Sequence, residues 1–217
     1  MKTKKPNQQE VWNKIAKEWY EFKDKNKDNK NKFEHSVTKF LKEQKGNILD
    51  LGAGTGRYLQ KIKRGKMWLV DFSEEMLKIA KKKSTKLKIP AEFVVSEAYN
   101  LPFEDSFFEG AICICVLHCI ETPWNRKKTI KEIFRVLKPG AKAKISTWDK
   151  ESGRFKNKEK ESYIKWTDKG SRYYYFFTRE ELEKELKKFG FKILEKIPSK
   201  VNIDFIVEKP LTSSHSS

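Results

Sequence analysis

The sequence predicts an α/β fold in which a largely parallel sheet is flanked by helices. Three observations predict it. From residue 48 onward, apolar strand-like runs alternate with helix-like segments, which is the pattern of consecutive strand–helix–strand units. A glycine-rich turn follows the first of these strands. Residues 110–117 are almost continuously apolar, as expected of a central strand that is buried on both faces.

Two helices are predicted ahead of the first strand. Apolar residues recur at helical spacing in residues 11–22, with Trp19 and Phe22 on the apolar side, which indicates a packed amphipathic helix. Residues 23–32 are almost all Lys, Asp and Asn, a composition typical of a polar linker without core residues. A second helix is predicted over residues 33–42.

The elements of the sheet then follow in alternation. Ser73 is a good N-cap for the helix after the second strand. Residues 93–98 form a predicted third strand that ends in an acid. Residues 127–137 place their apolar side chains on one helical face, and the Lys-Pro-Gly sequence that follows ends this helix. The next strand is predicted over residues 141–148.

The last third of the sequence has a different character. Residues 151–169 are charged, and we expect them to be irregular. Thr178 and Glu181 have the spacing of a capping box, which predicts the start of a helix. Residues 191–196 and 202–208 are two short strands, which we expect to pair antiparallel at the end of the sheet.

Length and composition favour one globular domain, because 217 residues with 37% hydrophobic residues can fill a sizeable core. We expect three parts: N-terminal helices with a polar linker (1–46), the cofactor-binding domain (47–209) and a disordered tail (210–217). No apolar run reaches 18 residues and no signal peptide is recognisable, so we expect a cytoplasmic protein without a membrane partner.

The net charge of +18 is large for this length and favours a polyanionic partner, above all nucleic acid. Only 7 of the 48 basic residues are Arg, so the lysines would contact backbone phosphates rather than read bases. A lysine excess is equally compatible with a solvated surface. Cys113, Cys115 and Cys119 lie in or just after one apolar segment, so we expect reduced thiols and no metal site.

The glycine-rich turn indicates a cofactor pocket. Residues 50–56 read Asp-Leu-Gly-Ala-Gly-Thr-Gly, and glycines at alternate positions permit positive φ angles and close backbone approach. We expect the N–H groups of this loop and the N-terminus of a following helix to face an anion. The dinucleotide fingerprint would need glycine where this chain has Arg57. Asp71, about 20 residues further on, suits a ribose, and Glu97 is placed to receive an adenine amino group.

This loop is similar to the S-adenosylmethionine (SAM) loop of class I methyltransferases. Segments outside it resemble the eukaryotic and archaeal tRNA wobble-uridine carboxymethyl methyltransferases, which include the methyltransferase domain fused to an AlkB-type oxygenase. These segments are Val-Leu-His-Cys-Ile-Glu-Thr at 116–122, Arg126, the Lys-Pro-Gly helix end, residues 11–20 and residues 172–177. The resemblance implies a Rossmann-like, seven-stranded class I methyltransferase sheet whose last strand is antiparallel.

The chain departs from the pattern of that family at three places. Cys119 stands where family members usually have a second histidine, and Tyr175 stands where they often have one. The Lys- and Asn-rich residues 23–32 replace an Arg- and Trp-containing segment. The motifs between residues 50 and 105 are shared with many SAM methyltransferases, quinone C-methyltransferases among them. The flanking segments therefore carry the substrate assignment.

The resemblance also implies roles for individual residues. The methionine end of SAM, the ribose and the adenine would be held by nine residues: Asp50, Gly52, Ala53, Gly54, Gly56, Asp71, Phe72, Glu97 and Ala98. On the substrate side, His118 would hold the uridine or close the pocket, Arg172 would pair with a carboxylate or phosphate, and Tyr20 would close over the cofactor. Trp148 and Tyr173 are candidates for stacking on a base. A structural role remains open for His118, a solvent-exposed surface position for Arg172, and a packing role for Tyr20, Trp148 and Tyr173.

The implied reaction is esterification of a carboxymethyl group on a wobble uridine of tRNA. The carboxylate is ionised at neutral pH, so no general base is needed and positioning does most of the work. Implied partners are the anticodon region of tRNA and a small zinc-binding activator subunit. Two other functions remain open: methylation of a small molecule or quinone, and a catalytically idle RNA-binding scaffold.

Overall fold

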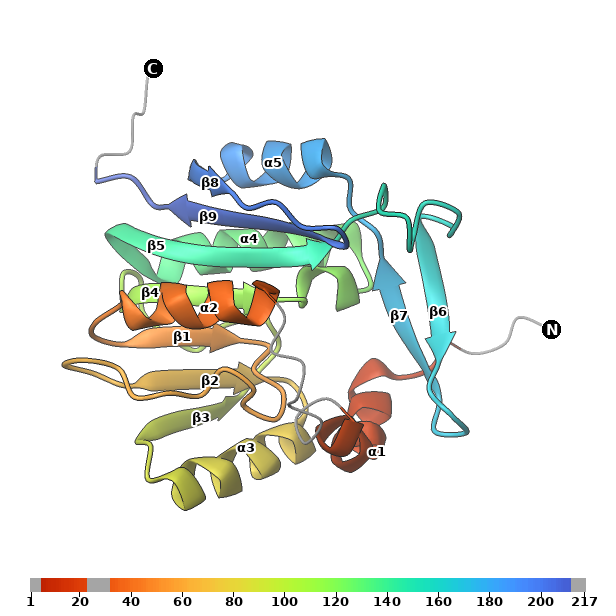
Figure 1. The fold of residues 1–217 in the computed structure, drawn as a ribbon, viewed down its shortest axis with the longest axis horizontal. Coiled ribbons are helices and arrows are strands. Elements are labelled where there is room, and N and C mark those ends of the chain that lie inside the picture. The colour runs from red at the N-terminus through yellow and green to blue at the C-terminus, as the bar shows by residue number, and fades with distance from the viewer. Residues whose placement is uncertain (1–4, 23–31, 212–217) are drawn as a thin grey trace.

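A seven-stranded sheet runs through the centre of the computed structural model, which describes residues 5–22 and 32–211 (Figure 1). Its strand order is β3-β2-β1-β4-β5-β9-β8, and β9 is antiparallel to both of its neighbours. The predicted sheet with an antiparallel last strand is therefore confirmed. The strands are β1 (Ile48–Leu51), β2 (Met67–Asp71), β3 (Ala91–Val95), β4 (Phe108–Ile114), β5 (Leu137–Trp148), β8 (Lys192–Lys196) and β9 (Asn202–Glu208).

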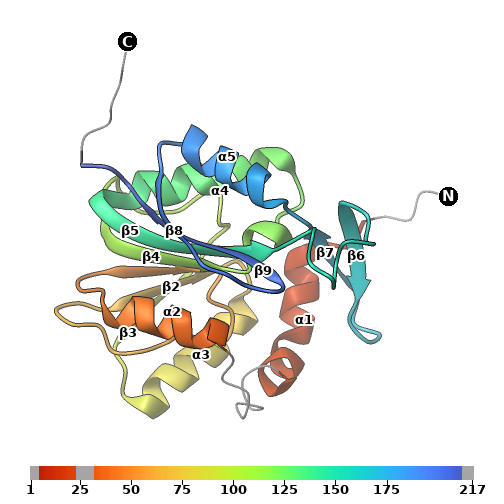
Figure 2. The same ribbon diagram turned by 45° about the horizontal axis from the view of Figure 1, so that its top comes forward.

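Helices cover both faces of the sheet, as Figure 2 shows. On one face, α4 (Pro123–Val136) and α5 (Arg179–Lys188) bury Ile130, Ile133 and Leu182 in the larger hydrophobic core. On the other face lie α2 (Lys32–Lys42) and α3 (Glu74–Leu87), which contribute to a second core. Both faces of the sheet are therefore buried, which explains the near-continuous apolar run in β4.

Side-chain caps begin the helices at the residues that the sequence favours. Ser73 Oγ accepts the N–H of Met76 at the start of α3. Thr178 and Glu181 form the predicted capping box of α5. Thr122 caps α4 ahead of a proline at the first helical position, so this helix begins several residues before the predicted start.

The connection between β1 and β2 contradicts one expectation. All of residues 52–66 lie in the described part of the chain, and they form turns and irregular backbone instead of the helix expected after the glycine loop. Ala53 and Leu59 still enter the core on the α2 and α3 face. The segment therefore covers the sheet with side chains, and it offers no helix N-terminus to a ligand.

A second, two-stranded sheet stands beyond the carboxyl ends of the parallel strands. It pairs β6 (Glu161–Lys165) with β7 (Ser171–Tyr175), so the prediction that residues 151–169 are irregular is wrong for β6. The alternating pattern of β6 is too polar to indicate a strand by itself. Pairing with the almost fully buried β7 stabilises it.

Helix α1 (Gln8–Tyr20) lies between this hairpin and α3 (Figure 2). The Gln8 side chain joins α1 to the hairpin, since its amide donates to Ser171 O and its carbonyl accepts the N–H of Tyr173. Trp19 packs in the small core at this junction, whereas Phe22 is 57% exposed, contrary to its predicted place on the apolar side. The predicted polar linker and disordered tail fall almost wholly outside the described residues.

Candidate cofactor and substrate pocket

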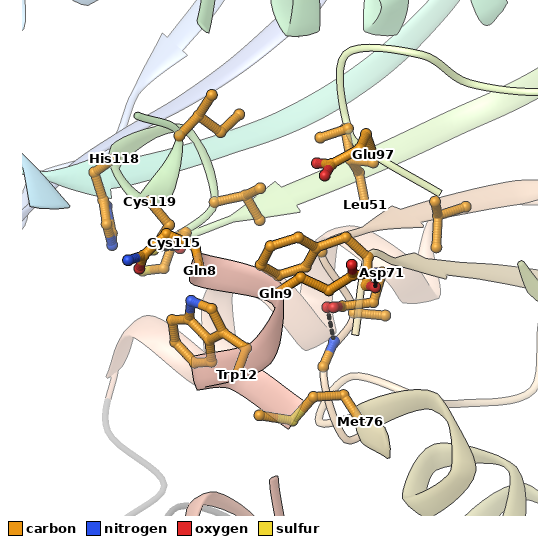
Figure 3. A pocket seen from close by; sticks show the side chains of 18 of the residues that line it. Gln8, Gln9, Trp12, Leu51, Asp71, Met76, Glu97, Cys115, His118 and Cys119 are labelled. Carbon is orange, nitrogen blue, oxygen red and sulfur yellow. Dashed lines mark hydrogen bonds between the residues drawn. The ribbon is translucent and has the colours of Figure 1, made fainter. Parts of the chain in front are cut away.

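A pocket of about 1050 Å³ opens at the carboxyl ends of the parallel strands (Figure 3). Its floor is the loop after β1, with Asp50 and Asp71 ending β1 and β2. Its wall is made by α1 and by the segment that follows β4. This is the edge at which open α/β sheets bind their ligands.

The glycine loop has the predicted positive φ angles. Gly52, Gly54 and Gly56 have φ angles of 69°, 52° and 72°, which L side chains rarely adopt. A Cβ on Gly52 would lie 2.2 Å from Val116 Cγ2, and a Cβ on Gly56 would lie 3.1 Å from Ala80. A Cβ on Gly54 would meet nothing within 4 Å. Two glycines thus permit close packing, while Gly54 leaves space on the pocket side.

The N–H groups of this loop do not serve an external anion, contrary to expectation. Gly52 and Ala53 donate to Val70 O, and Gly56 donates to Ala53 O. Gly54 donates to Asp71 Oδ2 over 2.8 Å, which is the dashed contact in Figure 3. The loop therefore uses its donors to fix its own shape and the orientation of Asp71.

The two carboxylates at the strand ends are poised for a cation. Asp50 is 2% exposed, and its Oδ2 atom has no hydrogen-bond partner. Burial, together with the nearby charge of Asp71, raises the pKa of Asp50 to about 7. Burial raises the pKa of Asp71 to about 6, although the N–H groups of Ser73 and Gly54 oppose the shift. A bound cation would relieve the cost of holding both acids ionised.

The residues predicted for the adenine side line the pocket. Phe72, Glu97 and Ala98 line the pocket where β2 and β3 end. Glu97 is half-buried, burial raises its pKa, and the Tyr99 hydroxyl hydrogen-bonds its side chain. Tyr99 itself lines the pocket, and sequence reasoning missed it because a tyrosine in a loop carries no motif.

Helix α1 closes the pocket with residues other than the predicted one. Gln9 donates from its side chain to Phe72 O over 2.7 Å, and Trp12 and Trp19 line the cavity. Tyr20 is half-buried and is not among the lining residues. The amphipathic pattern located this helix correctly but did not indicate which aromatic side chain would face the cavity.

His118 is the substrate-side residue whose geometry is best defined. It is 1% exposed within the short helix η2 (Leu117–Cys119) and stacks on Trp148 with ring centroids 4.5 Å apart. Its Nδ1 atom receives the backbone N–H of Trp148 at 3.1 Å and lies 2.9 Å from Thr147 Oγ1. An N–H group only donates, so Nδ1 is the acceptor and the ring proton is on Nε2. Burial, together with the nearby positive charge of Arg172, lowers the pKa of His118 to about 3.

Arg172 does not reach the pocket surface. It is 6% exposed, and its guanidinium lies over the rings of Trp12, Trp19 and Trp166, at 4.6 Å from the centroid of Trp166. Its Nε atom has no hydrogen-bond partner. Arg172 is therefore a buried positive charge behind these three tryptophan rings, which form an aromatic wall, and it does not itself contact a ligand in the pocket.

The two predicted stacking candidates have different surroundings. Trp148 lines the pocket and stacks on Tyr174, which sequence reasoning missed as a lining residue. Tyr173 is 3% exposed, does not line the pocket, and lies with its hydroxyl 3.0 Å from Arg126 Nη1. Arg126 also donates to Ile120 O, so it holds the segment after η2 in place.

A family model described as a methyltransferase domain matches residues 49–145. The match spans β1 to β5, including the glycine loop and both strand-end acids, and the strand order is that of class I methyltransferases. The chain carries a class I SAM-dependent methyltransferase domain. The cofactor of this methyltransferase domain is S-adenosylmethionine. The pocket fits that cation-bearing molecule, because the buried Oδ2 atom of Asp50 has no hydrogen-bond partner and can receive a positively charged group.

The names of proteins similar in sequence to this chain indicate two substrate classes, tRNA and quinones. The methyltransferase domain is 35% identical over 126 residues to the tRNA (carboxymethyluridine(34)-5-O)-methyltransferase of Arabidopsis thaliana, a match covering 58% of this chain and 28% of that protein. It is 33% identical over 110 residues to the ubiquinone/menaquinone biosynthesis C-methyltransferase UbiE of Cronobacter sakazakii, covering 48% and 43% of the two chains. The chain thus spans less than half the length of these two relatives.

The fold also matches a solved complex. A Haloferax volcanii methyltransferase bound to the Trm112 methyltransferase activator superposes with a TM-score of 0.71 at 16% identity, covering 94% of this chain and 100% of that one. At this identity the match supports the fold alone.

The described residues contain neither a metal site nor a membrane-spanning helix. Among residues 5–22 and 32–211, His, Cys, Asp and Glu form no group that could hold a metal ion, and no helix there is long and apolar enough to cross a membrane. Cys113 is buried, Cys115 and Cys119 are half-buried, and none of the three forms a disulfide with another described residue.

Proposed function

We propose that this chain methylates a carboxylate on a modified wobble uridine of tRNA, with SAM as methyl donor. The observation that carries the proposal is the state of His118. With Nδ1 occupied by Trp148 N–H and a pKa near 3, this imidazole is neutral and presents Nε2–H to the pocket. It can donate a hydrogen bond to an anionic or carbonyl oxygen, and it cannot accept a proton at neutral pH.

A carboxylate is the acceptor that suits this arrangement. It is ionised at neutral pH, so its oxygen is nucleophilic without a general base. The buried charge of Arg172 behind the aromatic wall favours a negatively charged group at this end of the pocket. SAM supplies an electrophilic methyl group that transfers to the oxygen in line. His118 would orient the acceptor, and Trp148 and Tyr174 would exclude water from it.

The substrate class rests on two further observations. The chain is 35% identical over 126 residues to a carboxymethyluridine methyltransferase, and the net charge of +18 suits a polyanion. Quinone C-methylation is the second candidate, which the similarity to UbiE favours. A catalytically idle RNA-binding scaffold is the least favoured function. It would not explain why a buried Asp50 oxygen lacks a hydrogen-bond partner or why Asp50 lies close to Asp71.

We further propose that an activator subunit covers the β3 edge of the sheet. Of the two edge strands, β8 begins and ends in lysine, while β3 reads Ala-Glu-Phe-Val-Val and ends in Val95, which is 52% exposed. An exposed apolar edge favours pairing with another chain. The Haloferax complex with an activator gives the class of partner. Substituting Val95→Lys should abolish co-purification with such a subunit without changing the SAM affinity of the isolated chain.

The test of the proposed function is a comparison of acceptors. Purified protein, with and without an activator subunit, receives isotopically labelled SAM together with tRNA that lacks the terminal ester, or with a demethylated quinol. Nucleoside mass spectrometry should show a labelled ester on the wobble uridine. Labelled quinol with unlabelled tRNA would favour the second candidate, and SAM binding with neither product would favour the scaffold.

A further inference from the structure

The first turn of α4 places an exposed tryptophan at the rim of the pocket. Trp124 is 74% exposed, whereas the other five tryptophans of the chain are half-buried. Thr122 and Asn125, on either side of it in sequence, both line the pocket. An exposed indole next to a ligand cavity offers a flat apolar face on which a ligand ring can pack.

The same face of α4 continues in lysines. Trp124, Lys128 and Lys131 are related as i, i+4 and i+7, so they lie along one line on the helix, on the side opposite the buried Ile133. All three are exposed, and neither lysine forms an ion pair with the described residues. Lys127, beside this line, is held 3.7 Å from Glu185. The face therefore offers one flat aromatic surface at the pocket rim and two exposed lysines leading away from it, of which Lys128 also contributes to lowering the pKa of Glu132.

We propose that this line of Trp124, Lys128 and Lys131 binds the RNA strand next to the methylated nucleotide. A nucleobase would stack on Trp124, and the following phosphates would lie against Lys128 and Lys131. Stacking on an aromatic ring tolerates any base, and lysines contact phosphate without reading sequence, so the surface would position the strand and leave selection of the reacting uridine to the pocket. This inference rests on the proposed function for the identity of the RNA.

The test measures RNA binding separately from methyl transfer. Binding of a labelled anticodon stem-loop is followed by fluorescence anisotropy for the unsubstituted protein, Trp124→Ala, Trp124→Phe and the pair Lys128→Gln with Lys131→Gln. The matched control is Lys82→Gln with Lys86→Gln, which removes two exposed lysines one turn apart from α3, on the opposite face of the sheet. Steady-state methylation of tRNA is measured for the same proteins, with SAM affinity as a check on folding.

Trp124→Ala should weaken RNA binding about ten-fold and raise the KM for tRNA, with SAM affinity unchanged, and Trp124→Phe should restore most of the loss. The α4 lysine pair should reduce the slope of log affinity against log salt by about 1.4, twice the single-strand value for one phosphate contact, and the α3 pair should not. Equal RNA affinity for Trp124→Ala and the unsubstituted protein would overturn the inference, as would equal effects of the two lysine pairs.

The failures of the two proposals are distinguishable. If the unsubstituted protein methylates tRNA and Trp124→Ala does so with an unchanged KM, only the α4 surface is wrong. If tRNA receives no methyl group but Trp124→Ala still weakens stem-loop binding, the surface is retained and the proposed reaction is wrong. If the unsubstituted protein does not bind the stem-loop at low salt, both are wrong.

Discussion

The backbone N–H of Trp148 donates to Nδ1 of His118, and the rings of the same two residues stack 4.5 Å apart. The last residue of β5 therefore fixes both the tautomer and the plane of the imidazole in η2. If Nδ1 were protonated, its N–H would face the N–H of Trp148, so two donors would repel each other. This repulsion agrees with the lowered pKa of His118. The histidine acts in our account as a fixed hydrogen-bond donor.

His118→Ala should lower kcat for tRNA methylation by about 10²-fold, because it removes one oriented donor to the acceptor oxygen. His118→Gln, whose amide can also donate, should recover part of that loss. SAM affinity should stay within about two-fold for both variants. The pH–rate profile of the unsubstituted enzyme should contain no ionisation of His118 near pH 6.5. His118→Gln should therefore leave the shape of that profile unchanged. A large rise in the KM for SAM would contradict the assignment of His118 to the substrate side.

Asp50 should make the ligand-free protein less stable at higher pH. Its folded pKa of about 7 lies above the reference value of 3.8, so the folded state holds this proton more tightly than the unfolded chain. The contribution of Asp50 to stability is therefore greatest below about pH 4 and declines as the pH rises to about 7. Asp50→Asn should raise the unfolding temperature of ligand-free protein at pH 8 and weaken SAM binding. A lower unfolding temperature with unchanged SAM affinity would be the opposite result.

Binding of SAM should also release protons. A cationic ligand beside Asp50 and Asp71 favours their ionised forms, so both pKa values should fall on binding. Calorimetric titrations at pH 6.5, in buffers of different ionisation enthalpy, should therefore show net proton release. The released number should be smaller for Asp50→Asn. An equal heat in all buffers would show that the acids do not respond to the ligand.

Gly52 and Gly54 should respond differently to alanine. Both have positive φ angles, which makes alanine unfavourable by about 1 kcal/mol at either position. At Gly52 the new Cβ would also overlap Val116, whereas at Gly54 it would project into free space. Gly52→Ala should therefore lower the free energy of unfolding clearly more than Gly54→Ala does. Gly54→Ala should mainly weaken SAM binding, and denaturant unfolding with parallel SAM titration distinguishes the two effects.

The local signals of the sequence were sufficient for the sheet and for the acids. The Ser73 cap and the Thr178–Glu181 capping box are decided within a few residues, so they could be predicted without tertiary structure. Asp50 and Asp71 lie at or next to the carboxyl ends of the parallel strands β1 and β2, and the topology of such a sheet brings these ends together. These features explain why the fold and the cofactor side could be derived from the sequence.

The substrate side depends on contacts between distant segments. Arg172 was predicted to face a ligand, but Trp12 and Trp19 from α1 and Trp166 from the hairpin enclose it. No local pattern indicates that these rings converge. The absence of a helix after the glycine loop is likewise a tertiary effect, because residues 52–66 adapt to the packing of α2 and α3.

The central claim is that a carboxylate on tRNA is the methyl acceptor. The most direct measurement is the transfer of label from SAM to tRNA lacking the wobble ester, with an activator subunit present and His118→Ala as the matched control. Our account predicts a labelled ester on the wobble uridine, at a rate that falls strongly in the variant. Labelling of a quinol in place of tRNA, or equal labelling of tRNA by both proteins, would contradict it.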